Sequence, residues 1–393
     1  MIEWLFLLLP LAAASGWWVA RRGTASVDGG KSAPDPAYFH GMNYLLDDQP
    51  DKAIDIFLKL AEVDSEAAEI QLALGGLFRR RGEVDRAIRV HQSLVARQNL
   101  GKQLRAFALY ELGQDYMRAG LFDRAESLFN ELVESKLHRR RALEGLLEIY
   151  QQEREWRRCL EVADRLQVLN GTPMGNEISH YHCELAEEAL RKGDDGLAER
   201  CLHAAHAADA GCVRATMLQA RLSMEGGELE RAIALFRHVA VQAPHVLPEI
   251  LPDLLDIHRQ RPREELLDEL RLLDREHASA PLALALSDVV QQAEGREAAI
   301  ALLVEYVNGH ADLAALERLL ELNEPLLACD GGQSMSVHRA MRRVVHHLRS
   351  NQPRYQCDQC GFVARRLHWQ CPSCKRWGSI QPVQPPLIEK SVA

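Results

Sequence analysis

The stretch LGQDYMRAGLFDRAESLF, residues Leu112–Phe129, shows the pattern that decides the fold. Its second half, FDRAESLF, places a small residue after two charged ones and ends on an aromatic residue. Closely similar phrases occur elsewhere in the chain, as PDKAIDIF at 50–57, VDRAIRVH at 84–91 and LERAIALF at 229–236. A phrase that returns at a regular distance predicts an array of structural repeats.

The small residue of each phrase sets the period. It occupies Ala53, Ala87, Ala125, Cys159, Ala198 and Ala232, in steps of 34, 38, 34, 39 and 34 residues. A period of about 34 residues is typical of the tetratricopeptide unit, in which two helices, A and B, pack against each other. Earlier positions of that pattern also match, at Gly41 and Tyr44, Gly75 and Phe78, and Gly113 and Tyr116. The sequence therefore predicts an all-α superhelical array over residues 37–350.

The later repeats are less regular. Leu147, Ala186 and Ala220 stand where helix A of the first three repeats has glycine. Beyond Pro244 the pattern weakens, although PREELLDELRLL (262–273) and REAAIALLVEYV (296–307) still have the spacing of amphipathic helices.

Charged residues precede the apolar part of several B helices. Asp85 and Asp123 are placed to cap these helices or to interact with their positive ends. Alternatively, Arg86, Asp123 and Arg124 contact a partner, because tetratricopeptide arrays commonly bind peptides or proteins. We find no phosphate-binding loop and no nucleophile elbow, and so expect no enzyme and no catalytic residue.

Charge is unevenly distributed along the 393 residues, of which 47% are hydrophobic and 26% charged. The net charge is -9, yet residues 339–376 contain nine Arg and Lys against Asp358 alone, a formal +8. The remainder is therefore near -17. The C-terminal part is a basic module on an acidic chain.

The N-terminus begins MIEWLFLLLPLAAASGWWVARRG. Residues 4–20 form a run of 17 residues without charge, and this length is the lower limit for crossing a bilayer. Arg21 and Arg22 follow at once. A cleaved signal peptide would have its positive charge before the apolar run. We expect residues 1–22 to be a single-pass transmembrane anchor with the bulk of the chain on the cytoplasmic side. Residues 23–36, rich in Gly, Ser and Pro, are expected to form a flexible linker.

Four of the nine cysteines are clustered near the C-terminus. Cys357, Cys360, Cys371 and Cys374 form two CxxC pairs separated by ten residues. Two such pairs supply the tetrahedral four-thiolate site that suits one zinc or one iron ion. A module this small cannot bury enough core to fold alone, so we expect the metal to be structural. Phe362, Trp369 and Trp377 are expected to form its core or its packing face on the last helices.

Two other functions use the same cysteines. An iron centre could serve electron transfer beside a di-iron bundle, but such a bundle needs two ExxH motifs and the chain has one, at Glu177–His180. Basic residues with Trp369 could instead bind nucleic acid, namely Arg365, Arg366, Lys375 and Arg376. The acidic chain and its expected anchor disfavour that interpretation, so we expect no nucleic-acid partner.

The apolar N-terminus ending in GWWVARRG, the repeats LFRRRGEVDRAIRVHQSL and LGQDYMRAGLFDRAESLF, and the closing RYQCDQCGF...HWQCPSCKRWGSI together resemble the lipopolysaccharide assembly protein B family. The resemblance covers the chain from end to end. It implies a rubredoxin-type metal domain at 353–383 that packs back on the repeats, with the four clustered cysteines as metal ligands. A C-terminal tail, residues 384–393, follows.

The resemblance also implies a function in the inner membrane of Gram-negative bacteria. The family acts as an adaptor that brings the deacetylase LpxC to the membrane protease FtsH and thereby restrains lipopolysaccharide synthesis. An inner-membrane regulator of the YejM type opposes it. The alternative is a scaffold that assembles lipopolysaccharide synthesis or export proteins without delivering any of them to a protease.

Overall fold

The computed structural model describes residues 39–41, 43–44, 49–63, 68–258, 262–276, 279–327 and 332–383. The expected anchor (1–22), linker (23–36) and tail (384–393) lie outside the described residues. Among the residues that are described, no helix is both long and apolar enough to cross a bilayer. The chain forms two compact units, with the boundary after Ile149, and each is described separately.

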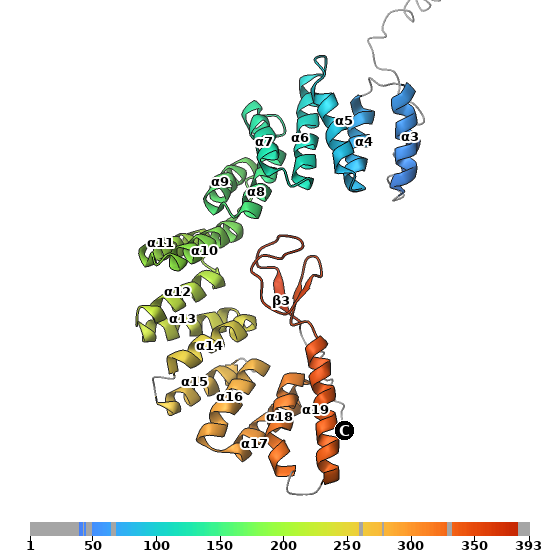
Figure 1. The fold of residues 1–393 in the computed structure, drawn as a ribbon. Helices are drawn as coiled ribbons and strands as arrows, with labels where there is room; N and C mark the ends of the chain where they lie inside the picture. The colour runs from blue at the N-terminus through green and yellow to red at the C-terminus, as the bar shows by residue number, and fades with distance from the viewer. Residues whose placement is uncertain are drawn as a thin grey trace, which may run out of the picture. The chain divides into compact units, whose positions relative to one another are not determined.

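The first unit consists of helices arranged in pairs (Figure 1). They are α3 (Pro50–Val63), α4 (Ala68–Arg80), α5 (Val84–Val95), α6 (Lys102–Arg118), α7 (Phe122–Ser135) and the first part of α8 (Arg139–Glu153). Helices α4 and α6 are the A helices of the two pairs α4–α5 and α6–α7. The predicted repeat architecture is confirmed here.

Small residues allow the paired helices to approach closely. The repeated small residues at 53, 87, 125, 159, 198 and 232 are all fully buried. A Cβ atom on Gly113 would lie 2.5 Å from the Phe129 ring, so only glycine fits opposite this aromatic residue. Gly145 of α8 meets the other side of the same ring, where a Cβ would lie 2.6 Å away. The fourth A helix therefore has its close-approach glycine two residues before Leu147, the position expected from the period.

His91 takes the place of the aromatic residue in helix α5 and brings polar contacts into the core. Its Nδ1 lies 2.5 Å from Asp115 Oδ2, and both side chains are fully buried. Arg79 donates to Asp115 at 2.7 Å and to Glu111 at 2.5 Å. This network satisfies a buried carboxylate and links helices α4, α5 and α6.

The second unit continues the helical pairs and ends in a small sheet. Its helices are the end of α8, then α9 (Trp156–Asn170), α10 (Gly175–Arg191), α11 (Asp195–Ala208), α12 (Val213–Glu225), α13 (Leu229–Gln242), α14 (Leu247–His258), α15 (Arg263–Glu276), α16 (Ala280–Ala293), α17 (Arg296–Gly309), α18 (Leu313–Leu327) and α19 (Gly332–Asn351), with a 3-10 turn at Pro244–Val246. Both weakly patterned stretches are helical, as α15 and α17. One continuous apolar core runs from α12 to α18.

The C-terminal module follows α19. Strands β1 (Tyr355–Cys357), β2 (Val363–Ala364) and β3 (Ile380–Pro382) form an antiparallel sheet in the order β2-β1-β3. Tyr355 pairs with both Ala364 and Pro382, so β1 is the central strand. The buried side of the sheet shares a small core with Phe362, Leu367 and three of the cysteines, Cys357, Cys371 and Cys374.

Candidate metal centre and its seat on the repeats

Each CxxC pair lies in a tight backbone turn. In the first, the Gly361 N–H donates to the Cys357 carbonyl at 3.0 Å, and in the second the Lys375 N–H donates to the Cys371 carbonyl at 2.9 Å. The residue after each pair has a positive φ, 75° at Gly361 and 60° at Lys375. The two turns therefore have matching form, and glycine relieves the strain at the first of them only.

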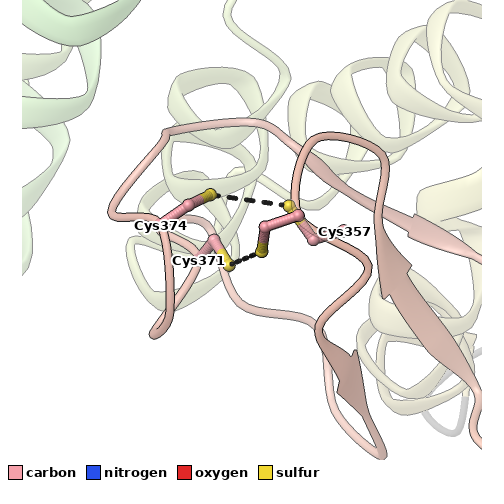
Figure 2. Close-up of side chains that lie close together, drawn as sticks. Cys357, Cys371 and Cys374 are labelled. Atoms are coloured by element: carbon pink, nitrogen blue, oxygen red, sulfur yellow. Dashed lines mark hydrogen bonds between the residues drawn. The ribbon is translucent and has the colours of Figure 1, made fainter. Parts of the chain in front are cut away.

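The two turns bring the four sulfur atoms together, as predicted (Figure 2). Sγ of Cys357 lies 3.7 Å from Sγ of Cys374, and Sγ of Cys360 lies 3.7 Å from Sγ of Cys371. All four sulfur atoms are within 4.8 Å of one another. Metal–sulfur bonds of about 2.3 Å in a tetrahedron give sulfur–sulfur edges of about 3.8 Å. The donor set and its size fit one tetrahedral zinc or iron ion.

The surroundings of the first turn favour thiolates. Ser379 Oγ lies 3.4 Å from Cys357 Sγ. Hydrogen bonding with Ser379, and then with the backbone of Cys360 and Gln359, lowers the pKa of Cys357 to about 6. The backbone at Phe362 lowers the pKa of Cys360 below its usual value. Since a metal binds the thiolate, these hydrogen bonds reduce the cost of deprotonating the ligands.

Trp377 anchors the module on the repeats. The indole stacks on the His180 ring of α10 with centroids 4.9 Å apart. Trp156 of α9 and Tyr181 of α10 meet it edge-on, at 6.0 Å and 5.9 Å. Only 8% of Trp377 is exposed. We call Trp377 with these three partners the aromatic seat.

Arg214 of α12 completes the seat with a positive charge. Its Cζ lies 6.0 Å from the Trp377 ring centroid and 5.9 Å from that of Trp369. The side chain is 4% exposed and donates to Glu184 at 2.8 Å and to Glu187 at 2.7 Å. Two carboxylates on α10 therefore neutralise a buried guanidinium, and its face remains available to the two indoles.

Hydrogen bonds at both ends fix the orientation of the module. At one end, Gln370 donates to Gln151 Oε1 at 2.7 Å, and Gln151 donates to the Tyr181 hydroxyl at 3.0 Å. At the other, the Tyr355 hydroxyl donates to Glu249 of α14 at 2.9 Å. The module thus contacts α8, α10, α12 and α14, which are the A helices of successive repeats, and the beginning of α9.

These contacts correct one expectation and agree with the rejection of a di-iron bundle. Trp369 and Trp377 pack on α9, α10 and α12 rather than on the last helices. Their partners on the central repeats are 150 residues or more away in the sequence, so no local pattern could indicate this packing. His180 of the single ExxH motif stacks on Trp377, so its ring is part of the seat and not of a di-iron site.

The nucleic-acid alternative loses its stacking residue, because the Trp369 ring packs against His180 and Arg214 of the repeats. Of the basic residues considered with it, Arg365 donates to the Ser350 carbonyl at 3.4 Å and Arg376 donates to Gln359 at 2.7 Å. Arg366 and Lys375 are exposed.

The three candidate partner-binding residues are exposed in the first turns of B helices α5 and α7. Arg86 covers the Phe78 ring at 4.0 Å and pairs with Glu83 at 2.5 Å. Arg124 lies 5.7 Å from the Tyr116 ring centroid. Asp85 and Asp123 lie in the first turns of α5 and α7, and the N-cap residues of these helices, Glu83 and Leu121, make no capping hydrogen bond through their side chains. A role in partner binding stays a prediction.

Sequence reasoning missed most of the residues that hold the module on the repeats, namely Gln151, Trp156, Tyr181, Glu184, Glu187, Arg214 and Gln370. Arg214 is the second residue of α12, and a buried arginine in the first turn of a helix gives no distinctive pattern in a single sequence. Trp156 is the one residue with a usable signal, because it begins the repeat phrase WRRCLEVA at 156–163, where the four phrases quoted above begin with Pro, Val, Phe or Leu.

Two family models match the chain. A model described as "Rubredoxin metal binding domain" matches residues 355–382. A tetratricopeptide repeat model matches residues 40–99, 110–156 and 183–245. Both agree with the observed elements, and the second stops where the sequence pattern weakens.

Curated relatives match over nearly the whole chain. Lipopolysaccharide assembly protein B of Escherichia coli (strain K12) is 36% identical, covering 98% of this chain and 99% of the relative. Lipopolysaccharide assembly protein B of Haemophilus influenzae is 32% identical, covering 98% of each. A solved tetratricopeptide repeat protein from Parabacteroides merdae aligns with 14% identity over 73% of this chain and 98% of its own, with a TM-score of 0.35. On the full-length matches, the chain belongs to the lipopolysaccharide assembly protein B family.

Proposed function

We propose that the protein is a non-enzymatic adaptor that promotes degradation of the deacetylase LpxC by an FtsH-type membrane protease. The observation that carries the proposal is that the cysteine module packs across four successive A helices, α8, α10, α12 and α14. The chain also matches lipopolysaccharide assembly proteins over 98% of its length. A repeat array presents an extended protein-binding surface. The module holds four of the A helices in fixed positions and thereby fixes the shape of part of that surface.

The module holds one structural metal ion, zinc or iron, through Cys357, Cys360, Cys371 and Cys374. All four positions of a tetrahedron are taken by thiolates, so the ion has no open position for a substrate. The ion supplies folding free energy to a module that has three short strands. Metal analysis of the purified full chain, expected at one ion per chain, tests this assignment; a content near zero in freshly purified, folded protein contradicts it.

Residues 1–22 anchor the chain in the inner membrane, with the repeats on the cytoplasmic side. The apolar run followed by two arginines supports this location. Confinement to the membrane plane raises the effective concentration of the adaptor near a membrane protease without any new contact. A regulator of the YejM type in the same membrane opposes the adaptor.

The proposal is tested by the half-life of LpxC in cells with and without this protein, with FtsH active or inactivated. We expect LpxC to persist longer when the protein is absent, and this difference to vanish when FtsH is inactive. An LpxC half-life that is independent of the protein while FtsH is active contradicts the adaptor function.

A scaffold that assembles lipopolysaccharide synthesis or export proteins is the second candidate, and the name of the relatives favours it. Scaffolding alone predicts an unchanged LpxC half-life together with a loss of lipopolysaccharide export when the protein is removed. The same cells therefore separate the two functions.

A further inference from the structure

The outward face of the last helix, α19, carries an exposed aliphatic stripe. Val337, Met341, Val344 and Leu348 are 51%, 55%, 58% and 50% exposed. They follow one another by four, three and four residues, the spacing of one helix face. Ala340, also exposed, lies on the same face. Terminal helices of repeat arrays normally have a polar outer face, because no further repeat covers them. We therefore expect another molecule or segment to cover this stripe.

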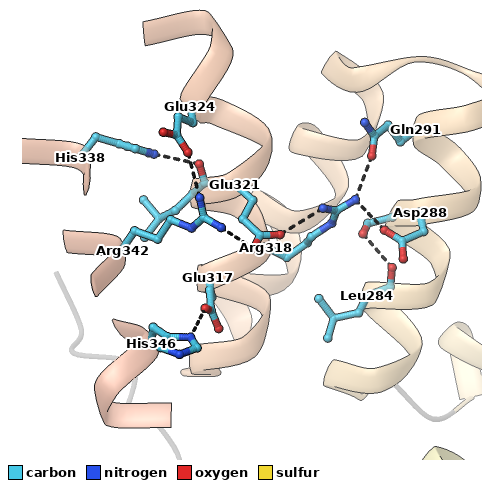
Figure 3. Close-up of polar contacts among 12 residues, drawn as sticks. Leu284, Asp288, Gln291, Glu317, Arg318, Glu321, Glu324, His338, Arg342 and His346 are labelled. Carbon is cyan, nitrogen blue, oxygen red and sulfur yellow. Dashed lines mark hydrogen bonds and ion pairs between the residues drawn. The ribbon is translucent and has the colours of Figure 1, made fainter. Parts of the chain in front are cut away.

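The opposite side of α19 is already occupied by α18 (Figure 3). Arg342 pairs with Glu321 at 2.8 Å and with Glu324 at 2.9 Å. Glu317 pairs with His346 and Arg349, each at 2.8 Å. These contacts fix the rotation of α19 about its axis, so that the stripe faces away from the helix that holds it.

Charge restricts what can cover the stripe. Helix α19 contains four arginines, Arg339, Arg342, Arg343 and Arg349, and no Asp or Glu. Three of them pair with glutamates of α18. Within the described part of the chain, Arg343 has no ion-pair partner, and it is exposed. The segment that follows adds the exposed Arg354, Arg365 and Arg366. The occupant should be apolar and negatively charged.

We propose that the stripe of α19 docks on the surface of a bilayer that contains anionic phospholipids. The four aliphatic side chains would enter the boundary between headgroups and acyl chains. Arg343 lies about 100° around the helix from Val344, at the edge of the stripe, and its long side chain would reach lipid phosphate from there. A second copy of this chain is the poorer occupant, because two α19 helices packed face to face bring two arginine-rich, acid-free helices together. The proposal does not depend on the adaptor function or on the N-terminal anchor.

The test uses the full chain reconstituted in liposomes, with a photoreactive benzoylphenylalanine in place of Val344. A matched probe replaces Val241 of α13, a helical valine that is 59% exposed. Irradiation is carried out in phosphatidylcholine vesicles with and without phosphatidylglycerol, and adducts are identified by mass spectrometry. We expect phospholipid adducts at position 344 only when phosphatidylglycerol is present, and background adducts at position 241 in both.

Two variants make the test specific. Met341→Glu places a charge in the stripe and should abolish the adduct at position 344, while thermal unfolding stays unchanged because the side chain is exposed. Arg343→Gln should lower the adduct yield by about fivefold, the effect of one cation near an anionic surface. Equal yields at 344 and 241 overturn the proposal. So does a predominant cross-link from 344 to a second chain or to residues 384–393.

Discussion

At the scale of single residues, Trp377 connects the module to the repeats. The indole contacts three aromatic rings of α9 and α10, and Arg214 adds a buried cation beside it. Such a cluster buries a large apolar area, and aromatic rings in these orientations stabilise each other by about 0.5–1.5 kcal/mol per pair beyond the effect of burial. None of these side chains is a metal ligand, so a substitution in the seat leaves all four thiolates in place.

We predict that Trp377→Ala uncouples the module from the repeats without releasing the metal. Removing a buried Trp costs about 3–5 kcal/mol. The urea midpoint for unfolding of the second unit should fall, while the metal content stays at the wild-type value. Trp377→Phe, which keeps a ring in the seat, should lose less. A midpoint unchanged in the alanine variant would show that the seat does not stabilise the unit.

His180 gives the seat a dependence on pH. Burial, and after it the charge of Arg214, lowers the pKa of His180 from 6.5 to about 3. The neutral ring is therefore the folded form, and protonation favours unfolding. The stabilisation is complete above about pH 6.5 and declines as the pH falls from there towards 3.

We predict that wild type loses about 1 kcal/mol more stability than His180→Phe between pH 7 and pH 5.5, since each unit of pH below the unfolded pKa costs up to about 1.4 kcal/mol. The phenylalanine keeps a ring against Trp377 and cannot titrate, so metal loss in acid affects both proteins alike. Urea unfolding at the two pH values measures the difference. Parallel losses in the two proteins would mean that His180 binds a proton as readily in the folded state as in the unfolded state.

At the scale of elements, the spacing of helices within a repeat depends on single glycines. Gly75 and Gly76 are neighbours in α4, and they have opposite surroundings. A Cβ on Gly75 would overlap the buried His91 ring, which Asp115 holds at 2.5 Å, whereas a Cβ on Gly76 would meet nothing within 4 Å. The pair is thus a matched control for helix propensity.

We predict that Gly75→Ala lowers the stability of the first unit by about 1–3 kcal/mol, the usual cost of overpacking a core. Gly76→Ala should raise it by up to about 1 kcal/mol, because alanine is the better helix former. Urea unfolding of the two variants measures both. If Gly75→Ala were as stable as Gly76→Ala, the close approach of α4 and α5 would not be what requires glycine.

At the scale of the whole molecule, the sequence was informative wherever contacts are local. The 34-residue period predicted the helical pairs, because each pair is a unit of adjacent residues, and the CxxC spacing predicted the sulfur cluster. The contact of Trp377 with His180 crosses 197 positions of the chain and follows no period. The stripe on α19 was also missed, because apolar spacing identifies an amphipathic helix without saying whether its face is buried.

We expect metal binding, the C-terminal module and the central repeats to form one cooperative structure. Hydrogen–deuterium exchange of the full chain, in wild type and in Cys371→Ser, tests it most directly. The variant lacks one thiolate and should lose the metal. We then expect faster exchange in the module and in α9, α10, α12 and α14, while α4 to α7 of the first unit remain as in wild type. Unchanged exchange in α10 and α12 of a variant that has lost its metal would contradict the claim.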